Sequence, residues 1–335
     1  MANKQIKIII TGSAGYIGAP LAYDLLKMGY KVIGIDNYAN SSSKNTEKLK
    51  QKFIDDYKFY KVDIALEPSK INAIFLEHKP TLVIHLAALK SVQESISSPN
   101  LYKNNNINST INILHTMALH NCKKIIYSSS AAVYGDKKIQ PIQENAQLNP
   151  ASPYAYTKLI CEKLINDACK KNKINGISLR YFNPIGYHSS GLFRDELSEN
   201  LGSIMQQIIK VATGKEKFLQ IYGNDYPTKD GTCERDFIHI EDVLDAHIKS
   251  IKYLDSLNGH EIFNIGTGLP TSILKLINIF IEINNIPINY KFAKRKKGDI
   301  QSSYADVKKI NLKMKWSASK DIKDMIMDTW NVYSK

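Results

Sequence analysis

The sequence has few of the residues that would place it among metal-bound or disulfide-bonded proteins. Its 335 residues include only four cysteines and two tryptophans. The cysteines, at positions 122, 161, 169 and 233, show neither a CxxC pair nor zinc-ligand spacing. That distribution argues against a disulfide framework and against a structural zinc site. We therefore expect no bound metal, with Cys161 and Cys169 as core residues.

Long apolar runs are also missing. No stretch approaches the ~20 residues of a membrane span, and the most apolar one, 273–283, is interrupted by Lys275, Asn278 and Glu282. We expect an amphipathic core helix there and no membrane partner. The first residues lead directly into a strand without the apolar region of a signal peptide, so the cytoplasm is the expected location.

Acidic residues are outnumbered, with 45 Lys and Arg against 32 Asp and Glu and a formal net charge of +13. A basic excess attracts nucleic acids and anionic surfaces. Here, however, the lysines are scattered, the one dense basic run is 294–297, and aromatic residues are not interleaved with basic ones as in nucleic-acid-binding modules. We expect a solvated basic surface that helps to collect an anionic small molecule, and no nucleic-acid partner.

The N-terminal region contains the first positive signal, an apolar run followed by a glycine-rich turn and a helical pattern. The turn reads TGSAGYIG, so Gly12, Gly15 and Gly18 are spaced Gly-x-x-Gly-x-x-Gly. Glycines let the backbone approach a pyrophosphate, and the N-terminus of the following helix offers N–H groups and a favourable dipole. The segment therefore predicts a dinucleotide-binding turn that includes Tyr16 and Ile17.

A second strand, predicted at 31–35, ends in Asp36. An acid at this point accepts a hydrogen bond from a ribose 2′-hydroxyl and repels a 2′-phosphate. The cofactor predicted from the residues is therefore NAD, and not NADP.

Strand and helix patterns alternate through the first half of the chain. Strands are expected at 59–62, 82–85, 124–128 and 177–181, and helices at 68–78, 105–120 and from Pro153 to about residue 171. Such alternation predicts a Rossmann-type, doubly wound parallel sheet of the α/β class with right-handed crossovers. Beyond Phe182 the pattern becomes rich in loops, with a further helix at 241–254 and a strand at 262–265, which predicts a smaller α/β substrate-binding lobe.

Tyr154 and Lys158 are the clearest candidates for chemistry. They lie four residues apart at the start of a predicted helix with Ser152 as its N-cap and Pro153 in its first turn. Residues at this spacing share one helix face. An ammonium beside a phenol favours the phenolate, so we predict a lowered pKa for Tyr154 and a role as general base. Tyr156 lacks a lysine at the same spacing.

These signals, together with five longer motifs, resemble the UDP-glucose (UDP-galactose) 4-epimerase family of the extended short-chain dehydrogenase/reductases. The motifs are LAALK (86–90), SSSAAVYG (128–135), LRYFNPIG (179–186), YGNDYPTKDGT (222–232) and RDFIH (235–239). The YPTKDGT segment is the most specific of them. The resemblance extends from end to end of the chain.

The resemblance implies roles for individual residues. Tyr154, Lys158 and Ser130 would be catalytic, Ser130 by a hydrogen bond to the reacting oxygen. The NAD contacts implied beyond the glycine turn and Asp36 are Asn37, Asp63, Ile64, Leu86, Ala87, Ala88, Lys90, Asn105, Ser128, Tyr154, Lys158 and Tyr181. The implied substrate contacts are Lys90, Ser130, Tyr154, Phe182, Asn183, Asn200, Leu201, Tyr222, Arg235, Lys296, Asp299 and Ser303.

The resemblance also implies an organisation and a reaction. Residues 1–182, with return segments from about 235–265, would bind NAD, and 183–335 would mainly form the UDP-sugar-binding lobe. The protein would be a homodimer. It would invert C4 of a UDP-hexose through a transient 4-ketone, acting on UDP-glucose and UDP-galactose. At the position of Ser303 the family has either a bulky tyrosine or a small residue. Serine is small, which predicts that UDP-GlcNAc and UDP-GalNAc are substrates too.

Three departures from the family pattern stand out. Ala88 replaces a glycine, Lys296 replaces an arginine that many members have, and 191–202 matches poorly.

The alternatives are a UDP-glucuronate 4-epimerase, a sugar-nucleotide 4,6-dehydratase and a non-catalytic NAD-binding regulator. A dehydratase normally has an Asp-Glu pair where this chain has Ala131-Ala132, and a regulator would be expected to lose Ser130, Tyr154 or Lys158.

Overall fold

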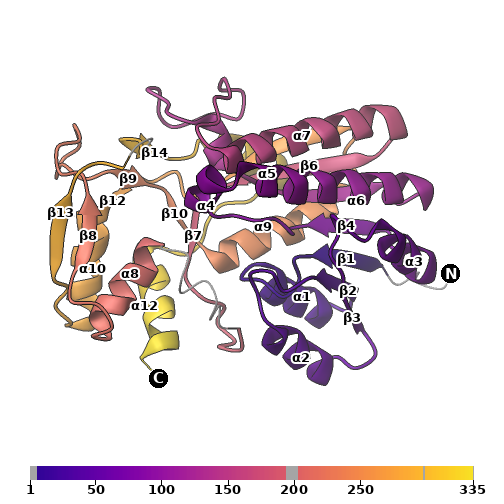
Figure 1. The fold of residues 1–335 in the computed structure, drawn as a ribbon, viewed down its shortest axis with the longest axis horizontal. Helices are drawn as coiled ribbons and strands as arrows, with labels where there is room; N and C mark the ends of the chain where they lie inside the picture. The colour runs from indigo at the N-terminus through magenta and orange to yellow at the C-terminus, as the bar shows by residue number, and fades with distance from the viewer. Residues whose placement is uncertain (1–5, 194–202, 297–298, 335) are drawn as a thin grey trace.

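Seven short segments rich in isoleucine, valine and leucine form one parallel sheet in the computed structural model, which describes residues 6–193, 203–296 and 299–334 (Figure 1). The strand order is β11-β6-β5-β4-β1-β2-β3. The strands are β1 (Lys7–Thr11), β2 (Lys31–Asp36), β3 (Tyr57–Lys61), β4 (Leu82–His85), β5 (Lys124–Ser130), β6 (Asn175–Tyr181) and β11 (His260–Ile265). This confirms the predicted α/β fold class.

Both faces of the sheet are buried, which explains why its central strands read as nearly continuous apolar runs. Because side chains alternate along a strand, Ile8 and Ile10 enter one core cluster and Ile9 enters the other. One face is covered by α1 (Gly18–Lys27), α2 (Ser43–Lys52) and α9 (Ile240–Tyr253), and the other by α3 (Pro68–His78), α6 (Asn108–Leu119) and α7 (Pro153–Asn172).

Several predicted boundaries shift by one to three residues. The strand predicted at 59–62 is β3, the helix predicted at 241–254 is α9, and the strand predicted at 262–265 is β11. The helix predicted at 105–120 does not start as a regular α-helix. It follows α4 (Val92–Ser97) and α5 (Pro99–Tyr102), passes through the π-helical turn η1 (Lys103–Ile107) and only then becomes α6.

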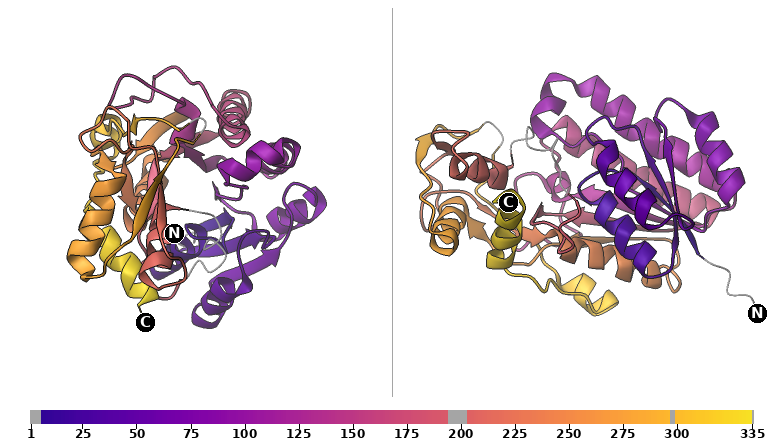
Figure 2. Two further views of the ribbon diagram at one scale, coloured as in Figure 1. Left: turned by 60° about the vertical axis from the view of Figure 1, so that its left-hand side comes forward. Right: turned by 90° about the horizontal axis from the view of Figure 1, so that it is seen from below.

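The smaller lobe has its own core and lies at one end of the main sheet (Figures 1 and 2). Its helices are α8 (Ile204–Ala212), α10 (Ile273–Asn284) and α12 (Ile322–Tyr333), while α11 (Lys308–Met314) packs near β11. Its short strands form two two-stranded sheets, β10-β7 and β13-β8, and one three-stranded sheet, β12-β9-β14. They are β7 (Asn183–Ile185), β8 (Leu219–Tyr222), β9 (Glu234–Arg235), β10 (Phe237–His239), β12 (Thr271–Ser272), β13 (Tyr290–Ala293) and β14 (Ser302–Ser303). The run at 273–283 is the predicted amphipathic core helix α10. No helix in the described ranges is both long and apolar enough to cross a bilayer.

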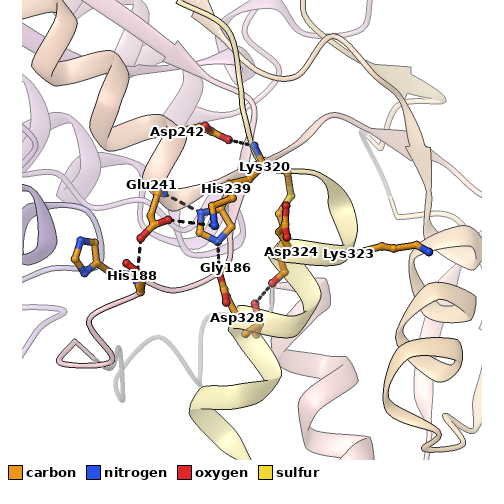
Figure 3. Close-up of polar contacts among 12 residues, drawn as sticks. Gly186, His188, His239, Glu241, Asp242, Lys320, Lys323, Asp324 and Asp328 are labelled. Carbon is orange, nitrogen blue, oxygen red and sulfur yellow. Dashed lines mark hydrogen bonds and ion pairs between the residues drawn. The ribbon is translucent and has the colours of Figure 1, made fainter.

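The C-terminal segment is held to the start of α9 by charged groups (Figure 3). Asp328 of α12 lies 3.2 Å from Nε2 of His239, whose Nδ1 accepts a hydrogen bond from the N–H of Glu241 (3.0 Å). The buried carboxylate of Asp242 accepts from both the N–H and the hydroxyl of Ser319 (2.9 and 2.8 Å).

The connections leave β1 and β4 in opposite directions along the sheet, so the strand order changes course between them. In open α/β sheets, such a switch point opens a crevice outside the carboxyl ends of the strands, where ligands bind.

Candidate active site

A cavity of about 330 Å³ lies at the carboxyl ends of the parallel strands, where the switch point predicts a ligand site. Every residue predicted to bind the cofactor lines it, from the glycine turn through Asp36 and Asn105 to Tyr181. The predicted catalytic residues Tyr154, Lys158 and Ser130 line it as well, as does Phe182. The fold therefore brings the predicted cofactor-binding and catalytic residues together around one cavity.

The glycine turn is tightly constrained by its neighbours. Gly12 has φ +71°, and a Cβ there would lie 2.8 Å from the backbone nitrogen of Ala87. A Cβ on Gly18 would lie 2.1 Å from the carbonyl oxygen of Gly12. The N-terminus of α1 has no side-chain cap. Its dipole and N–H groups are thus available to an anion that approaches the turn.

Asp36 closes the strand beside the turn and is buried at 7% exposure. Its carboxylate accepts hydrogen bonds from the N–H of Ala14 (3.0 Å), the N–H of Tyr38 (2.8 Å) and the hydroxyl of Ser41 (3.0 Å). Burial raises the pKa of Asp36 above its ordinary value, and these hydrogen bonds oppose that rise.

The loop that includes Ala88 is held by a residue that the sequence analysis missed. The amide of Asn106 accepts from the N–H of Leu89 (2.8 Å) and donates to its carbonyl (3.0 Å), and it also donates to Thr157 of α7 (3.1 Å). Asn106 lies in the π-helical turn η1, beside Asn105, which lines the cavity. A run of three asparagines, which are weak helix formers, was the available signal for this irregularity.

Helix α7 begins as its sequence predicts. Ser152 accepts a hydrogen bond from the N–H of Ala155 (3.2 Å), and Pro153 occupies the first turn. Lys158, only 3% exposed, donates from Nζ to the carbonyl oxygen of Ser128 at 2.6 Å. Its Nζ lies 5.9 Å from the ring centroid of Tyr154.

The electrostatics of this pair differ from the sequence prediction. Burial raises the pKa of Tyr154 above its ordinary value, and a hydrogen bond with Ser130 opposes the rise. Burial also lowers the pKa of Lys158 to about 8, although Cys161 and Glu162 nearby oppose that fall. The predicted lowering of the Tyr154 pKa is therefore wrong for the protein alone, because the cost of desolvating the phenolate outweighs the hydrogen bond with Ser130.

His85 is a packing residue, as its position in a strand predicts. It is 1% exposed, and its ring nitrogens lie 2.8 Å from the Thr11 hydroxyl and 3.1 Å from the Thr110 hydroxyl. Burial lowers its pKa to about 3, with the charge of Lys158 acting in the same direction. Its imidazole is neutral at physiological pH and is not a proton donor for the cavity.

A second group of predicted residues gathers in the smaller lobe. Nζ of Lys296 lies 4.0 Å from the ring centroid of Tyr222. Arg235 forms an ion pair with Asp299 and is the β-sheet partner of Ser303. None of these five described residues lines the large cavity.

The remaining predicted substrate residues fall in three places. Asn183 donates from its side chain to the carbonyl oxygen of Asp236 (3.1 Å), at the junction of the lobes, and Lys90 is an exposed residue at the rim of the cavity. Asn200 and Leu201 lie outside the described residues.

The fold and cavity define a dinucleotide-binding protein with a tyrosine and a lysine at its ligand site. The glycine turn, the uncapped helix N-terminus and the acid at the end of β2 fit the pyrophosphate and ribose of such a cofactor.

Comparisons with known proteins agree with this class. Residues 8–266 match the model of the NAD dependent epimerase/dehydratase family. A UDP-glucose 4-epimerase from Bacillus subtilis is 36% identical over 324 residues, covering 96% of this chain and 95% of that protein.

Solved structures are similar over nearly the whole chain. A UDP-glucose 4-epimerase from Stenotrophomonas maltophila with bound NAD and formylated UDP-arabinopyranose has a TM-score of 0.94 and 34% identity, covering 98% of each chain. One from Bifidobacterium longum in complex with NAD⁺ and UDP has a TM-score of 0.91 and 37% identity, also covering 98% of each chain. The chain belongs to the NAD dependent epimerase/dehydratase family.

We predict that Gly18→Ala reduces the NAD content of the purified protein by about tenfold or more. The new methyl group would overlap the carbonyl of Gly12 and displace the turn, at a cost of about 1–3 kcal/mol. NAD is measured in the supernatant after denaturation. Gly29→Ala is the control for the added methyl group, because a Cβ there meets nothing within 4 Å, although the φ of +87° at Gly29 strains the backbone of that variant. Full NAD content in Gly18→Ala would show that the turn does not hold the cofactor.

Proposed function

We propose that this protein is a UDP-hexose 4-epimerase that interconverts UDP-glucose and UDP-galactose with tightly bound NAD. The observation that carries the proposal is the convergence of Tyr154, Lys158 and Ser130 on the same cavity as the dinucleotide-binding turn. C4 of a hexose has no neighbouring group that acidifies its C–H bond, so direct deprotonation cannot invert it. Oxidation to a 4-ketone followed by reduction from the other face can.

Bound NAD supplies a hydride acceptor, a positive charge that favours a phenolate, and later the hydride that is returned. The chain itself manages the proton. Tyr154 takes the proton of the 4-hydroxyl and returns it, and Ser130 donates a hydrogen bond to the same oxygen. Lys158, anchored on the carbonyl of Ser128 with its ammonium 5.9 Å from the ring centroid of Tyr154, would hold the ribose of the cofactor.

The two groups of residues correspond to two ligands. We assign NAD to the larger lobe, formed by 1–182 with return segments from about 235–265, and the UDP-sugar mainly to 183–335. Support comes from α9 and β11, which pack on or in the main sheet although they follow parts of the smaller lobe in the sequence. The stacked Lys296 and Tyr222 and the guanidinium of Arg235 suit a diphosphate and a base.

The geometry disfavours the alternatives from other reaction classes. Ala131 and Ala132 form the short helix η2 (Ala131–Tyr134) directly after Ser130, and they offer no acid or base to remove the C5 proton or expel a 6-hydroxyl. A non-catalytic regulator has no need for the catalytic set that lines the cavity.

We also propose a homodimer. Its support is the exposure of apolar side chains on α6, where Ile111 and Leu119 are 44% and 63% exposed.

The direct test is incubation with UDP-glucose, UDP-galactose, UDP-GlcNAc, UDP-GalNAc or UDP-glucuronate, each without added NAD. We expect UDP-glucose and UDP-galactose to be converted reversibly into each other, with no absorbance that indicates accumulating NADH. NADH formed in proportion to product would instead identify a dehydrogenase, and loss of water from the sugar would identify a dehydratase.

We predict that Tyr154→Phe lowers kcat by about 10²-fold or more, because the base for the 4-hydroxyl is lost. NAD content should stay close to that of the unaltered protein. Tyr156→Phe is the matched control, since Tyr156 lies two residues away on the same helix with 45% exposure. Near-full activity of Tyr154→Phe would show that another group transfers the proton.

The finer substrate range rests on Ser303. This residue lies in β14 beside Arg235 of β9, is 7% exposed, and its carbonyl accepts from the N–H of Asp236 (3.0 Å). By the family resemblance this position lies beside the C2 substituent of the sugar, where a small side chain would leave space for an N-acetyl group. We therefore propose that the N-acetylated pair, UDP-GlcNAc and UDP-GalNAc, is accepted as well.

Ser303→Tyr should abolish turnover of the N-acetylated pair and spare UDP-galactose, because a phenol would occupy the space for the acetamido group. Ser303→Ala, which stays small, should keep all four substrates. kcat/KM is compared for both pairs in each variant. Equal loss on both pairs, or no turnover of UDP-GlcNAc by the unaltered protein, would exclude Ser303 as the determinant.

A further inference from the structure

Two oppositely charged side chains are buried directly behind the catalytic helix. Glu162 of α7 is 3% exposed and Arg180 of β6 is 1% exposed. The guanidinium donates to both carboxylate oxygens, from Nε at 2.9 Å and from Nη2 at 2.6 Å. This bidentate pairing fixes the relative orientation of both groups.

The pair also reaches the strand that carries the catalytic serine. The hydroxyl of Ser129 donates to the carboxylate of Glu162 at 2.5 Å. Ser129 lies between Ser128, whose carbonyl holds Lys158, and Ser130. Glu162 itself is one helical turn beyond Lys158. One carboxylate therefore ties the catalytic helix to strand β5 at Ser129 and to strand β6 at Arg180.

Stability alone does not explain these charges. Burying a carboxylate and a guanidinium carries a desolvation cost that their attraction often only balances, and apolar replacements of such pairs are frequently neutral or stabilising. What the pair adds is a defined geometry, since a shift of the helix along the strands would break three directed hydrogen bonds to the carboxylate of Glu162. Arg180 is itself held by a further hydrogen bond to the carbonyl oxygen of Glu144 (3.1 Å).

The same network continues toward the smaller lobe. The guanidinium of Arg180 lies 4.7 Å from the ring centroid of Tyr134, whose hydroxyl donates to the side chain of Asn264 (2.6 Å). Asn264 donates to the carbonyl oxygens of Ile142 (2.8 Å) and Asp306 (3.3 Å). Ile142 is one end of an isolated β-bridge to Ala305, the residue before Asp306 and two positions beyond Ser303.

We propose that Glu162 is a positioning residue for the reaction. Held by Arg180 and Ser129, it sets α7 against β5 so that Tyr154 and Ser130 meet at one oxygen. Through Tyr134 and Asn264, the same contacts orient the segment that carries Ser303. The expected effects on kcat and KM depend on the proposed function, whereas the contacts of Glu162 with Arg180 and Ser129 do not.

Glu162 also acts on Lys158 electrostatically. The ionisable groups around that ammonium are Tyr154, Cys161 and Glu162 on its own helix, Tyr127 on β5 and His85 on β4. Cys161 and Glu162 act to raise the pKa of Lys158, and the carboxyl group of Glu162 is the one that pairs with Arg180. Removing its charge should lower the pKa of Lys158 further below about 8.

The experiment compares Glu162→Gln with the unaltered protein. We expect kcat to fall about 10- to 100-fold with KM for the UDP-sugar changed less than about threefold, because misplaced groups slow the chemistry more than they weaken binding. NAD content should be unchanged. The rate at which acetic anhydride acetylates Lys158 is measured by peptide mass spectrometry as a function of pH. We expect this profile to show that Lys158 loses its proton at a lower pH in Glu162→Gln than in the unaltered protein. That readout requires no turnover.

A double variant, Glu162→Leu with Arg180→Met, separates positioning from simple scaffolding. It should regain the thermal stability lost in Glu162→Gln, yet keep the low kcat. Asp242→Asn is the control, because Asp242 is an equally buried carboxylate with directed hydrogen bonds outside the cavity, and it should lower stability without lowering kcat of NAD-loaded protein.

Full kcat in Glu162→Gln, or recovery of both stability and kcat in the double variant, would overturn the proposal. An unaltered protein that turns over none of the sugars would instead refute the proposed function. In that case an unshifted Lys158 acetylation profile in Glu162→Gln would refute the positioning role as well, and a shifted one would support it.

Discussion

The buried ammonium of Lys158 is the interaction on which the rest of the site depends. A lysine that is 3% exposed must find acceptors within the protein, and the carbonyl oxygen of Ser128 supplies one at 2.6 Å. That contact joins a helix to the carboxyl end of a parallel strand, and it leaves the phenol of Tyr154 on the same side of the helix. Desolvation then shifts both groups toward their neutral forms, which makes the site responsive to any charge that enters it.

The parallel sheet brings the other residues of the site to the same cavity as Lys158. Parallel strands deliver their carboxyl ends to one edge, so the glycine turn, Asp36 and the serines of β5 reach a single cavity without long loops. Where the helix before α6 would pass the cavity with regular geometry, a π-helical turn directs Asn105 toward the cavity and lets Asn106 hold the loop at Leu89. Irregular backbone is thus used at the site and regular structure behind it.

The smaller lobe is joined to this site through few but specific contacts. Tyr16 of the glycine turn donates to the carbonyl oxygen of Gly186, and β7 leaves the end of β6 to pair with β10. The site at α1 and β2 and the site at Arg235 and its neighbours therefore lie on two lobes whose relative position these contacts hold.

The sequence by itself determined the fold class, the glycine turn, the acid at the end of β2 and the Tyr154–Lys158 pair, because each is a local pattern with a period or spacing of a few residues. Only the tertiary structure decided what depends on distant neighbours. It showed that burial raises the pKa of Tyr154, since the desolvating atoms come from several elements. It also brought Glu162 beside Arg180 and Ser129, three residues whose spacing in the chain carries no signal. Pairing between strands and the loss of water on folding are set by the whole chain, and no local pattern records them.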